Sequence, residues 1–424
     1  MKFFQPKFFE IFKNYSKKQF VSDLIAGLIV AIIALPLSIA LAIASGVSPE
    51  KGLYTAIIAG FVIGFLGGSR VNISGPTAAF ATIVAGIVAE RGVVGLAAAT
   101  MMAGAILVLM GILRLGSLIR YIPETITVGF TSGIAVTIVI GQIKDFLGLT
   151  FAEGTHAVET TEKLEAIAAS IATVNPLALL VGLAALVILI LWPRVSKKIP
   201  GSLIAVFLLT AVVLLADLRV NTIGDLYEIG SALPQFSLPV LSGAEIRALI
   251  PDAFTIALLA AIESLLSCVV SDRMIDDTHN SNTELIAQGT GNICSALFGG
   301  IPATGAIART AANVKNGGRS PVSAIVHAAV LLAVLVLLMP YAAWIPMPVI
   351  AAVLFMVAYN MSEWRHFVAI CKKMPLYDTA VLVLTFVLTV AFDLVVAISV
   401  GLAVHYLIVL IKYLVKKRTA QAEN

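Results

Sequence analysis

Charged residues are scarce in this sequence. Asp, Glu, Lys and Arg make up 12% of its 424 residues, whereas 59% of the residues are hydrophobic. A soluble domain carries about a quarter of its residues as charged side chains, so this composition excludes a soluble globular protein. Because a membrane-spanning helix takes about 20 apolar residues, the chain has room for roughly a dozen spans or more.

Cysteine is also rare, and its pattern excludes two kinds of site. The three cysteines, Cys268, Cys294 and Cys371, are odd in number and lack metal-ligand spacing, so they predict neither a disulfide framework nor a metal site. We interpret them as small buried apolar residues. The sequence also lacks a nucleophile–base pair and a nucleotide-binding loop. It therefore predicts no enzyme activity and no cofactor.

The hydrophobic runs predict fourteen transmembrane segments in an all-α polytopic membrane protein. The third and tenth segments are too short to cross a bilayer alone, and each follows an irregular stretch rich in Gly and Pro. We expect these two to be half-helices preceded by short strands. The fourteen predicted segments are 22–45, 52–67, 76–89, 93–113, 124–148, 174–193, 202–217, 252–274, 284–298, 306–314, 321–340, 347–360, 378–392 and 394–414.

The distribution of Lys and Arg predicts the orientation of these segments. With the leader 1–20 in the cytoplasm, 21 of the 28 basic residues fall on the cytoplasmic side, 6 fall outside and Arg309 lies within the membrane. This is the asymmetry of the positive-inside rule. We therefore expect a multi-pass protein of the bacterial inner (plasma) membrane with both termini cytoplasmic. The net charge of +4 then reflects topology, and we expect a lipid bilayer, not nucleic acid, around the chain.

The longest polar stretch divides the chain into two halves. Residues 218–250 form the predicted outer connecting loop between a first repeat, 21–217, and a second repeat, 251–415, and the tail 416–424 is expected in the cytoplasm. Each half holds seven segments. Because seven is odd, the halves enter the membrane from opposite sides, which gives an inverted-topology repeat. The other outer loop, 150–172, is rich in Glu and is expected to be solvated.

Both halves carry a similar interruption at their third segment. Phe65-Leu66-Gly67-Gly68 leads to Gly75-Pro76 in the first half, and Leu297-Phe298-Gly299-Gly300 leads to Gly305-Ala306 in the second. Non-helical backbone at membrane depth survives only where protein or a cavity satisfies it. Paired interruptions of this kind indicate a transporter site, so we expect substrate to bind between the two half-helices. The alternative is a pair of ordinary kinked helices.

Two ionisable residues lie deep in the predicted membrane region. Arg309 falls in the first turns of the second half-helix, and Glu263 falls midway along the eighth segment. Intramembrane charges are costly and usually functional, and the guanidinium group suits oxyanions. The alternative is a structural Arg309–Glu263 pair. His327 and His405 are interpreted as core residues, whereas Pro36 either kinks the first span or lines the site.

A charge count links these residues to coupling. Each half-helix N-terminus is worth about half a positive charge, so the two termini and Arg309 together supply roughly +2. Ionised Glu263 lowers this to roughly +1, and its protonation restores the full value. A dianion should therefore prefer a protonated Glu263. This preference is a physical route to proton–anion symport.

At these residues the sequence resembles the SulP (sulfate permease) family of anion transporters. The stretch Pro49-Glu50-Lys51-Gly52-Leu53-Tyr54-Thr55-Ala56, followed by Gly67-Gly68-Ser69-Arg70, resembles its signature, although Lys51 replaces the usual aromatic residue. The stretch from Gly299 to Thr310, GGIPATGAIART, resembles its tenth-span motif. The stretch from Asn280 to Gly289, NSNTELIAQG, is also similar to the family. The resemblance covers residues 20–415.

The resemblance implies a fold of fourteen segments shared with uracil permease-like carriers. A core of spans 1–4 and 8–11 would hold the anion, and a gate of spans 5–7 and 12–14 would flank it. Glu263 matches an acidic position that is an aspartate associated with sodium in bicarbonate members, whereas glutamate resembles proton-coupled members. At two positions the sequence departs from the family pattern: Leu37 stands where the family often has a glutamine, and Ala308 stands where it often has a serine. These departures leave backbone amides as the main hydrogen-bond donors to the anion. The family usually continues into a STAS domain, but this sequence ends at Asn424, as a trimmed or a naturally short form.

We therefore predict a secondary active carrier for sulfate or a related oxyanion or C4-dicarboxylate, driven by proton symport. The dicarboxylate option comes from the stretch Val357–Glu363, which weakly resembles the branch of the family that includes dicarboxylate carriers. The alternatives are sodium-coupled bicarbonate transport and a passive anion exchanger or channel. We expect a homodimer, and a coupling ion, H⁺ or else Na⁺, bound by Glu263, Ser267 and Thr304. The predicted substrate-binding residues are Pro36, Leu37, Thr77, Ala78, Ala79, Phe80, Gly305, Ala306, Ile307, Ala308 and Arg309.

Overall fold

The structure is a computed structural model. It describes residues 4–11, 15–117, 123–152, 154–155, 157, 159–196, 199–240, 242–392 and 394–422. The predicted cytoplasmic leader and tail therefore lie partly outside the described residues. Of the basic residues counted for orientation, Arg120, Lys197 and Lys198 also lie outside them.

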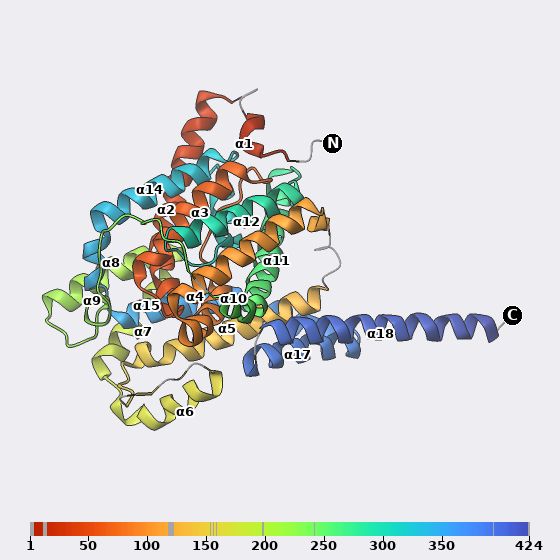
Figure 1. Ribbon diagram of the computed structural model, residues 1–424. Coiled ribbons are helices and arrows are strands. Elements are labelled where there is room, and N and C mark those ends of the chain that lie inside the picture. The colour runs from red at the N-terminus through yellow and green to blue at the C-terminus, as the bar shows by residue number, and fades with distance from the viewer. Residues whose placement is uncertain are drawn as a thin grey trace.

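The first half of the chain is a succession of helices with one short strand (Figure 1). Typical capping residues bound several of them. For example, Asn175 accepts hydrogen bonds from two backbone amides at the start of α7 and is followed by Pro176, a favourable helix start. The elements are α1 (Lys7–Glu10), α2 (Lys17–Ala44), α3 (Pro49–Leu66), β1 (Ser74–Gly75), α4 (Ala78–Ile112), α5 (Glu124–Leu147), α6 (Thr160–Ser170), η3 (Ile171–Thr173), α7 (Pro176–Val195), α8 (Gly201–Leu215), α9 (Ile223–Leu226) and α10 (Gly243–Ala248).

The second half is also a succession of helices with one short strand, and its last helix extends away from the rest of the bundle (Figure 1). Its elements are α11 (Ile250–Ile275), α12 (Ser281–Leu297), β2 (Thr304–Gly305), α13 (Ile307–Lys315), α14 (Val322–Leu338), η4 (Met339–Trp344), α15 (Met347–Met361), α16 (Trp364–Lys373), α17 (Leu376–Ala391) and α18 (Leu394–Ala422).

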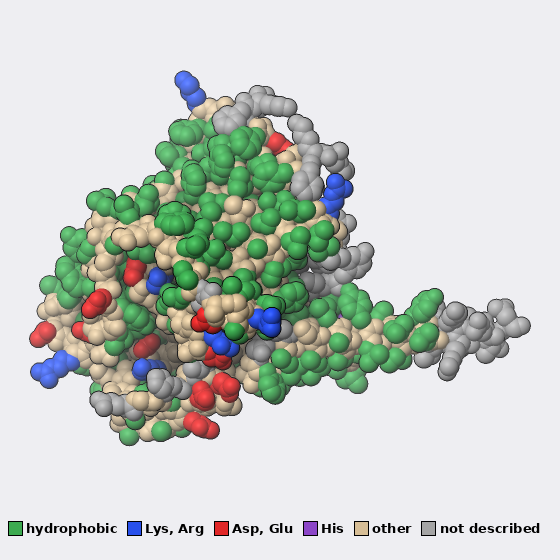
Figure 2. Space-filling model, viewed as in Figure 1, with side chains coloured by type: hydrophobic (Ala, Val, Ile, Leu, Met, Phe, Trp, Pro, Cys, Tyr) green, Lys and Arg blue, Asp and Glu red, His purple; other side chains and the backbone are tan. Residues whose placement is uncertain are grey.

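Many of these helices are suited to a bilayer. Within the described part of the chain, nine helices are long and apolar enough to cross a membrane, and α8 and α17 are apolar but shorter. Hydrophobic side chains cover most of the face shown in Figure 2, and several of the acidic side chains on it gather near α6. The predicted helical membrane fold is confirmed. The count of fourteen segments and the 7+7 repeat stay predictions.

One predicted boundary is replaced by a break inside a longer helix. The sequence predicts separate elements at 76–89 and 93–113, whereas α4 runs through both. Gly92 interrupts it with φ 69° and ψ −179°. Glycine adopts this positive φ without the steric cost that a side chain would bring. The chain therefore continues past the half-helix with little intervening loop.

The helices pack in two groups. One group contains α2, α3, α4, α11, α12, α13 and α14, and the other contains α5, α7, α8, α15, α17 and α18. Smaller contacts, such as those of α2 with α8 and α15, join the groups. The first group holds both strands and both half-helices. That the two groups act as a moving core and a gate stays a prediction.

Three segments differ from the sequence expectation. The predicted solvated loop 150–172 contains α6, which begins at a capping box formed by Glu159 and Glu162. A further helix, α16, follows α15 after Glu363, which adopts φ 43°. The connecting loop 218–250 holds α9 and α10. These helices are short or amphipathic, so a search for apolar runs passes over them.

The chain that begins just before α9 and ends shortly before α10 forms a strap, which we define as residues 221–240. At its start, Thr222 pairs with Pro346 in an isolated antiparallel bridge just before α15. Farther along, the Ala232 carbonyl accepts a hydrogen bond from the Tyr54 hydroxyl at 2.8 Å. The Ser237 amide donates to the Leu297 carbonyl at 2.7 Å. The strap therefore contacts both helix groups.

Candidate functional site

Two short strands bring the half-helices to one place. β1 and β2 pair antiparallel, with Ser74 opposite Gly305 and Gly75 opposite Thr304. The Ala306 amide extends this pairing by donating to the Ile73 carbonyl at 2.8 Å. Each strand leads directly into a half-helix, β1 into α4 and β2 into α13. The N-terminal ends of both half-helices therefore line a single cavity.

Neither half-helix has a side-chain cap at its start. Thr77 is the N-cap residue of α4 but makes no capping bond, and its hydroxyl instead donates to Glu263 Oε2 at 2.9 Å. Ala306 caps α13 and has no polar side chain. The first-turn amides of a helix have no partner within the helix. The two starts therefore leave backbone donors for an external acceptor, together with a partial positive charge.

Arg309 adds a permanent positive charge behind these amides. Its side chain is 3% exposed, and Nη2 donates to the Pro76 carbonyl at 3.1 Å. Nη1 has no hydrogen-bond partner among the described residues. A Cβ atom at position 75 would lie 2.7 Å from Nη1, so Gly75 leaves the space that the guanidinium group occupies. Arg309 thus links the two half-helices and retains a free donor.

Glu263 lies midway along α11 and lines the same cavity. Among the described ion pairs, none joins Glu263 to Arg309, so the structure does not contain the structural pair considered from the sequence. Its described hydrogen bond comes from Thr77. The next residue, Ser264, accepts the Gly305 amide at 3.0 Å and lies 2.7 Å from Thr304 Oγ1. α11 therefore places an acidic group at the first half-helix and fixes the strand before the second.

The cavity between the two helix groups has a volume of about 1030 Å³. Most of the residues predicted from the sequence line it, together with residues of α5, α7 and α15. Its lining includes Leu37, Thr77, Ala78, Ala79, Glu263, Gly305, Ala306, Ile307, Ala308 and Arg309.

Four of the predicted residues lie outside the lining of this cavity. Phe80 is 1% exposed within the hydrophobic core, and Pro36 is buried inside α2. The Ser267 hydroxyl donates to Asn72 Oδ1 at 2.8 Å. The Thr304 hydroxyl bonds to Ser264. These four residues pack behind the cavity wall.

Sequence reasoning missed part of the lining. Leu41 is one helical turn beyond Leu37, and this spacing could have identified it. Thr131 and Val353 come from helices of the other group, and Glu363 follows one of them. No sequence spacing relates these three residues to the half-helices, because their position depends on how the two groups pack.

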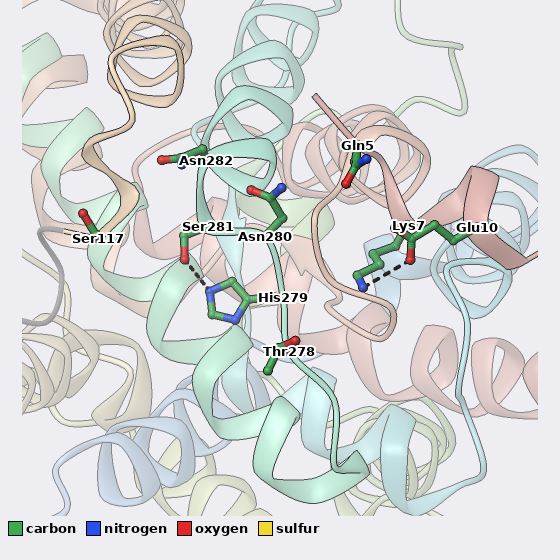
Figure 3. A pocket seen from close by; sticks show the side chains of 9 residues that line it. All are labelled: Gln5, Lys7, Glu10, Ser117, Thr278, His279, Asn280, Ser281 and Asn282. Carbon is green, nitrogen blue, oxygen red and sulfur yellow. Dashed lines mark hydrogen bonds and ion pairs between the residues drawn. The ribbon is translucent and has the colours of Figure 1, made fainter. Parts of the chain in front are cut away.

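A second, smaller cavity of about 460 Å³ lies at the start of α12 (Figure 3). Lys7 and Glu10 form an ion pair on one side of it, with Lys7 Nζ 3.2 Å from Glu10 Oε2. His279 lies on the other side, with Nε2 2.9 Å from the Ser281 hydroxyl. None of the predicted site residues lines this cavity.

Comparisons with known proteins agree with this geometry. Residues 20–385 match the model of the sulfate permease family. The chain is 45% identical to "Putative sulfate transporter YvdB" of Bacillus subtilis (strain 168), over 93% of this chain and 74% of that protein. It is 34% identical to "Bicarbonate transporter BicA" of Synechocystis sp., over 82% of this chain and 62% of that protein. These names describe transporters and not enzymes.

Solved structures show the same fold. The transmembrane domain of a cyanobacterial bicarbonate transporter BicA matches with a TM-score of 0.82 at 33% identity, over 90% of this chain and 98% of that one. The structure of SLC26A9 matches with a TM-score of 0.87 at 21% identity, over 95% of this chain and 67% of that one. The SulP resemblance deduced from the sequence is therefore confirmed: this chain belongs to the sulfate permease family of anion transporters.

Proposed function

We propose that this protein is a secondary active carrier that takes up sulfate, or a related oxyanion or C4-dicarboxylate, together with protons. One observation carries the proposal. Two uncapped helix starts and the free Nη1 donor of Arg309 surround one cavity. Backbone amides at helix N-termini bind anions, and a guanidinium group suits the geometry of an oxyanion.

The cavity supports an inward-open state. Its lining includes Pro193, Gly201, Ser202 and Glu363. These residues lie at or beside the ends of helices, and the positive-inside rule places the connections next to them on the cytoplasmic side. The proposed topology, with both termini cytoplasmic, then has the anion released from this cavity into the cell. The homodimer also stays a prediction.

Glu263 is the proposed coupling residue. We expect Glu263→Gln to retain anion binding, because glutamine imitates the protonated carboxyl group permanently. Wild-type affinity for a dianion should rise as the pH falls, since protonation removes a negative charge from the cavity. The variant should lose this pH dependence and the stimulation of uptake by an inward proton gradient. Titration calorimetry across pH and radiolabelled uptake in proteoliposomes measure the two effects.

Two comparisons make this coupling test specific. Exchange of internal for external anion should persist in the variant, because exchange needs no net proton movement. Full pH stimulation in Glu263→Gln would exclude Glu263 as the coupling site. Stimulation of the wild type by sodium instead of protons would favour the alternative of sodium-coupled bicarbonate transport, for which the similarity to BicA is the supporting observation.

The substrate itself is tested by uptake from a panel. Sulfate, bicarbonate, fumarate and chloride should be presented to proteoliposomes with a proton gradient, with a sodium gradient and with neither. We expect proton-driven accumulation of sulfate or fumarate above equilibrium. Movement that only follows the anion's own gradient would indicate a channel or a passive exchanger.

The space beside Gly75 gives a further prediction. We expect Gly75→Ala to weaken anion binding about tenfold, or about 1.4 kcal/mol, because the new methyl group displaces Arg309 Nη1. Gly86→Ala is the matched control, since Gly86 lies in the half-helix that follows Gly75 and a Cβ atom there meets nothing within 4 Å. Calorimetric affinities of the two variants should differ. Equal affinities would show that the position of Nη1 does not matter.

A further inference from the structure

One face of α12 is polar although the helix lies inside the bundle. Glu284, Gln288, Asn292 and Ser295 are all 0% exposed. Their spacing of four, four and three residues places them on one side of the helix. α12 packs against α3, α4 and α11 (Figure 1). We call these four residues the α12 stripe.

The first part of the stripe holds the chain before β1. Glu284 Oε2 accepts hydrogen bonds from the amides of Gly68 at 2.9 Å and Ser69 at 3.3 Å. Its Oε1 accepts from Asn72 Nδ2 at 2.8 Å and from Gln288 Nε2 at 2.9 Å. Gln288 also donates to the Ser74 hydroxyl at 3.0 Å. One carboxylate therefore receives four donors.

The second part of the stripe holds the chain before β2. Asn292 Nδ2 donates to the Ala303 carbonyl at 2.9 Å, and Asn292 Oδ1 accepts the Ala303 amide at 2.8 Å. The Ser295 hydroxyl donates to the Ile301 carbonyl at 2.8 Å. A single helix thus binds the irregular segments that precede both half-helices. Because a helix is rigid over this length, the stripe fixes how far apart these segments lie.

The network continues from Glu284 toward the candidate site. The Asn72 side-chain amide has Nδ2 bound to Glu284 and Oδ1 facing the other way. Oδ1 accepts hydrogen bonds from the Ser267 hydroxyl at 2.8 Å and the Thr310 hydroxyl at 3.0 Å. Thr310 also accepts the Ile73 amide at 3.0 Å. Thr310 follows Arg309, and Ser267 lies one turn beyond Glu263. Glu284 is therefore two hydrogen bonds away from the helices that carry both cavity charges.

The start of α12 is itself held in place. Asn280 Oδ1 accepts the Thr283 amide at 3.1 Å, and Asn282 Oδ1 accepts the Gly116 amide at 3.0 Å. His279 lies between Asp272 and Ser281, with Nδ1 2.7 Å from Asp272 Oδ2 and Nε2 2.9 Å from the Ser281 hydroxyl. Glu284 therefore projects from a fixed helix end, which suits it to orient the irregular chain before β1.

We propose that Glu284 is a positioning residue for anion binding. Its two oxygens orient Asn72 and the backbone at Gly68 and Ser69, so that Pro76 and the first amides of α4 face Arg309. The inference rests on the proposed function, because it assigns how that site is held in shape. Among the described residues, no Lys or Arg forms an ion pair with Glu284. Hydrogen-bond donors alone therefore compensate its charge.

The donor pattern suggests a rescue experiment. In Glu284→Gln, one carboxylate oxygen becomes an NH₂ group, which is a donor. It then faces other donors: Asn72 Nδ2 and Gln288 Nε2 if it replaces Oε1, or the amides of Gly68 and Ser69 if it replaces Oε2. In Asn72→Asp, a carboxyl oxygen at position 72 faces the Glu284 carboxyl oxygen, so two acceptors oppose each other. In the double variant Glu284→Gln/Asn72→Asp, the new amide at position 284 donates to the new carboxylate at position 72. That carboxylate can still accept from Ser267 and Thr310, so the exchange restores a donor–acceptor match at this contact.

We expect each single variant to weaken anion binding by at least tenfold in folded, monodisperse protein, and the double variant to return within about threefold of wild type. Thr290→Val is the matched control on α12, because the Thr290 hydroxyl bonds to the Ile286 carbonyl of its own helix. Calorimetry with sulfate measures affinity, and hydrogen exchange of residues 67–75 measures how firmly the segment is held. The rate of hydrogen exchange of residues 67–75 should rise in both single variants and fall again in the double variant.

The outcomes separate this inference from the proposed function. If Glu284→Gln bound sulfate with wild-type affinity and showed wild-type hydrogen exchange at residues 67–75, the positioning role would be overturned. A double variant that bound sulfate no more tightly than the single variants would overturn it too. Lower thermal stability with unchanged affinity would also overturn it, since Glu284 would then be merely structural. If wild-type protein binds no anion of the panel, the proposed function fails, and the exchange pattern alone decides whether Glu284 positions the segment.

Discussion

Arg309→Ala is expected to weaken anion binding roughly 100-fold while the protein stays folded. The substitution removes the guanidinium group that joins the half-helices and supplies the free Nη1 donor. Loss of one buried, hydrogen-bonded charge opposite a ligand costs about 3 kcal/mol, which corresponds to roughly 100-fold in affinity. Titration calorimetry with sulfate, and thermal unfolding with and without sulfate, measure the effect.

Two further variants define what Arg309 contributes. Arg309→Lys keeps the positive charge but lacks the forked guanidinium group, whose two nitrogens reach the Pro76 carbonyl and the cavity at the same time. We therefore expect its anion affinity to lie between those of wild type and Arg309→Ala. Arg247→Ala removes an exposed arginine outside the cavity and should bind as wild type. Unchanged affinity in Arg309→Ala would assign Arg309 to a structural role.

Ala306→Leu is expected to abolish uptake without preventing membrane insertion. Ala306 caps α13 and lines the cavity, where its small side chain lets an anion approach the amides of Ile307 and Ala308. A leucine side chain would fill this approach. Hydrogen bonds weaken steeply when donor and acceptor are held apart, so uptake should fall to the level of empty proteoliposomes.

Further variants separate blockage from misfolding. Ala308→Leu adds the same bulk at an exposed position of the cavity wall, and Ala79→Leu adds it at the other half-helix. Ala105→Leu is the matched control, because Ala105 is exposed on α4 and lies outside the cavity lining. Normal uptake in both Ala306→Leu and Ala308→Leu would place the anion elsewhere.

The interruptions of the half-helices could be predicted because their signal is local. Paired glycines at Gly67-Gly68 and Gly299-Gly300, with Pro76 just before the N-cap residue of α4, break the helical pattern within a few residues. A deep Arg309 and Glu263 stand out in apolar runs for the same reason. These features located most of the cavity lining on the first helix group.

The partners of these residues could not be predicted, because they depend on tertiary packing. Sequence reasoning considered an Arg309–Glu263 pair as an alternative. The structure instead pairs Arg309 with the Pro76 carbonyl and Glu263 with Thr77. The helix that carries the α12 stripe was predicted as the segment 284–298, but the role of its polar face was not. Its spacing is visible in the sequence, but a backbone partner more than 200 residues away is not.

The strap sets a limit on how far the two helix groups can separate. It is fixed beside α15 at Thr222 and fixed to α3 where Tyr54 binds Ala232. About ten residues lie between these anchors, and a fully extended chain of that length reaches roughly 35 Å. The strap therefore acts as a tether that bounds the separation of its two anchors, and the helix α9 within it shortens its reach below that of a fully extended chain. Deletion of residues between the anchors would lower this bound on how far the two helix groups can separate.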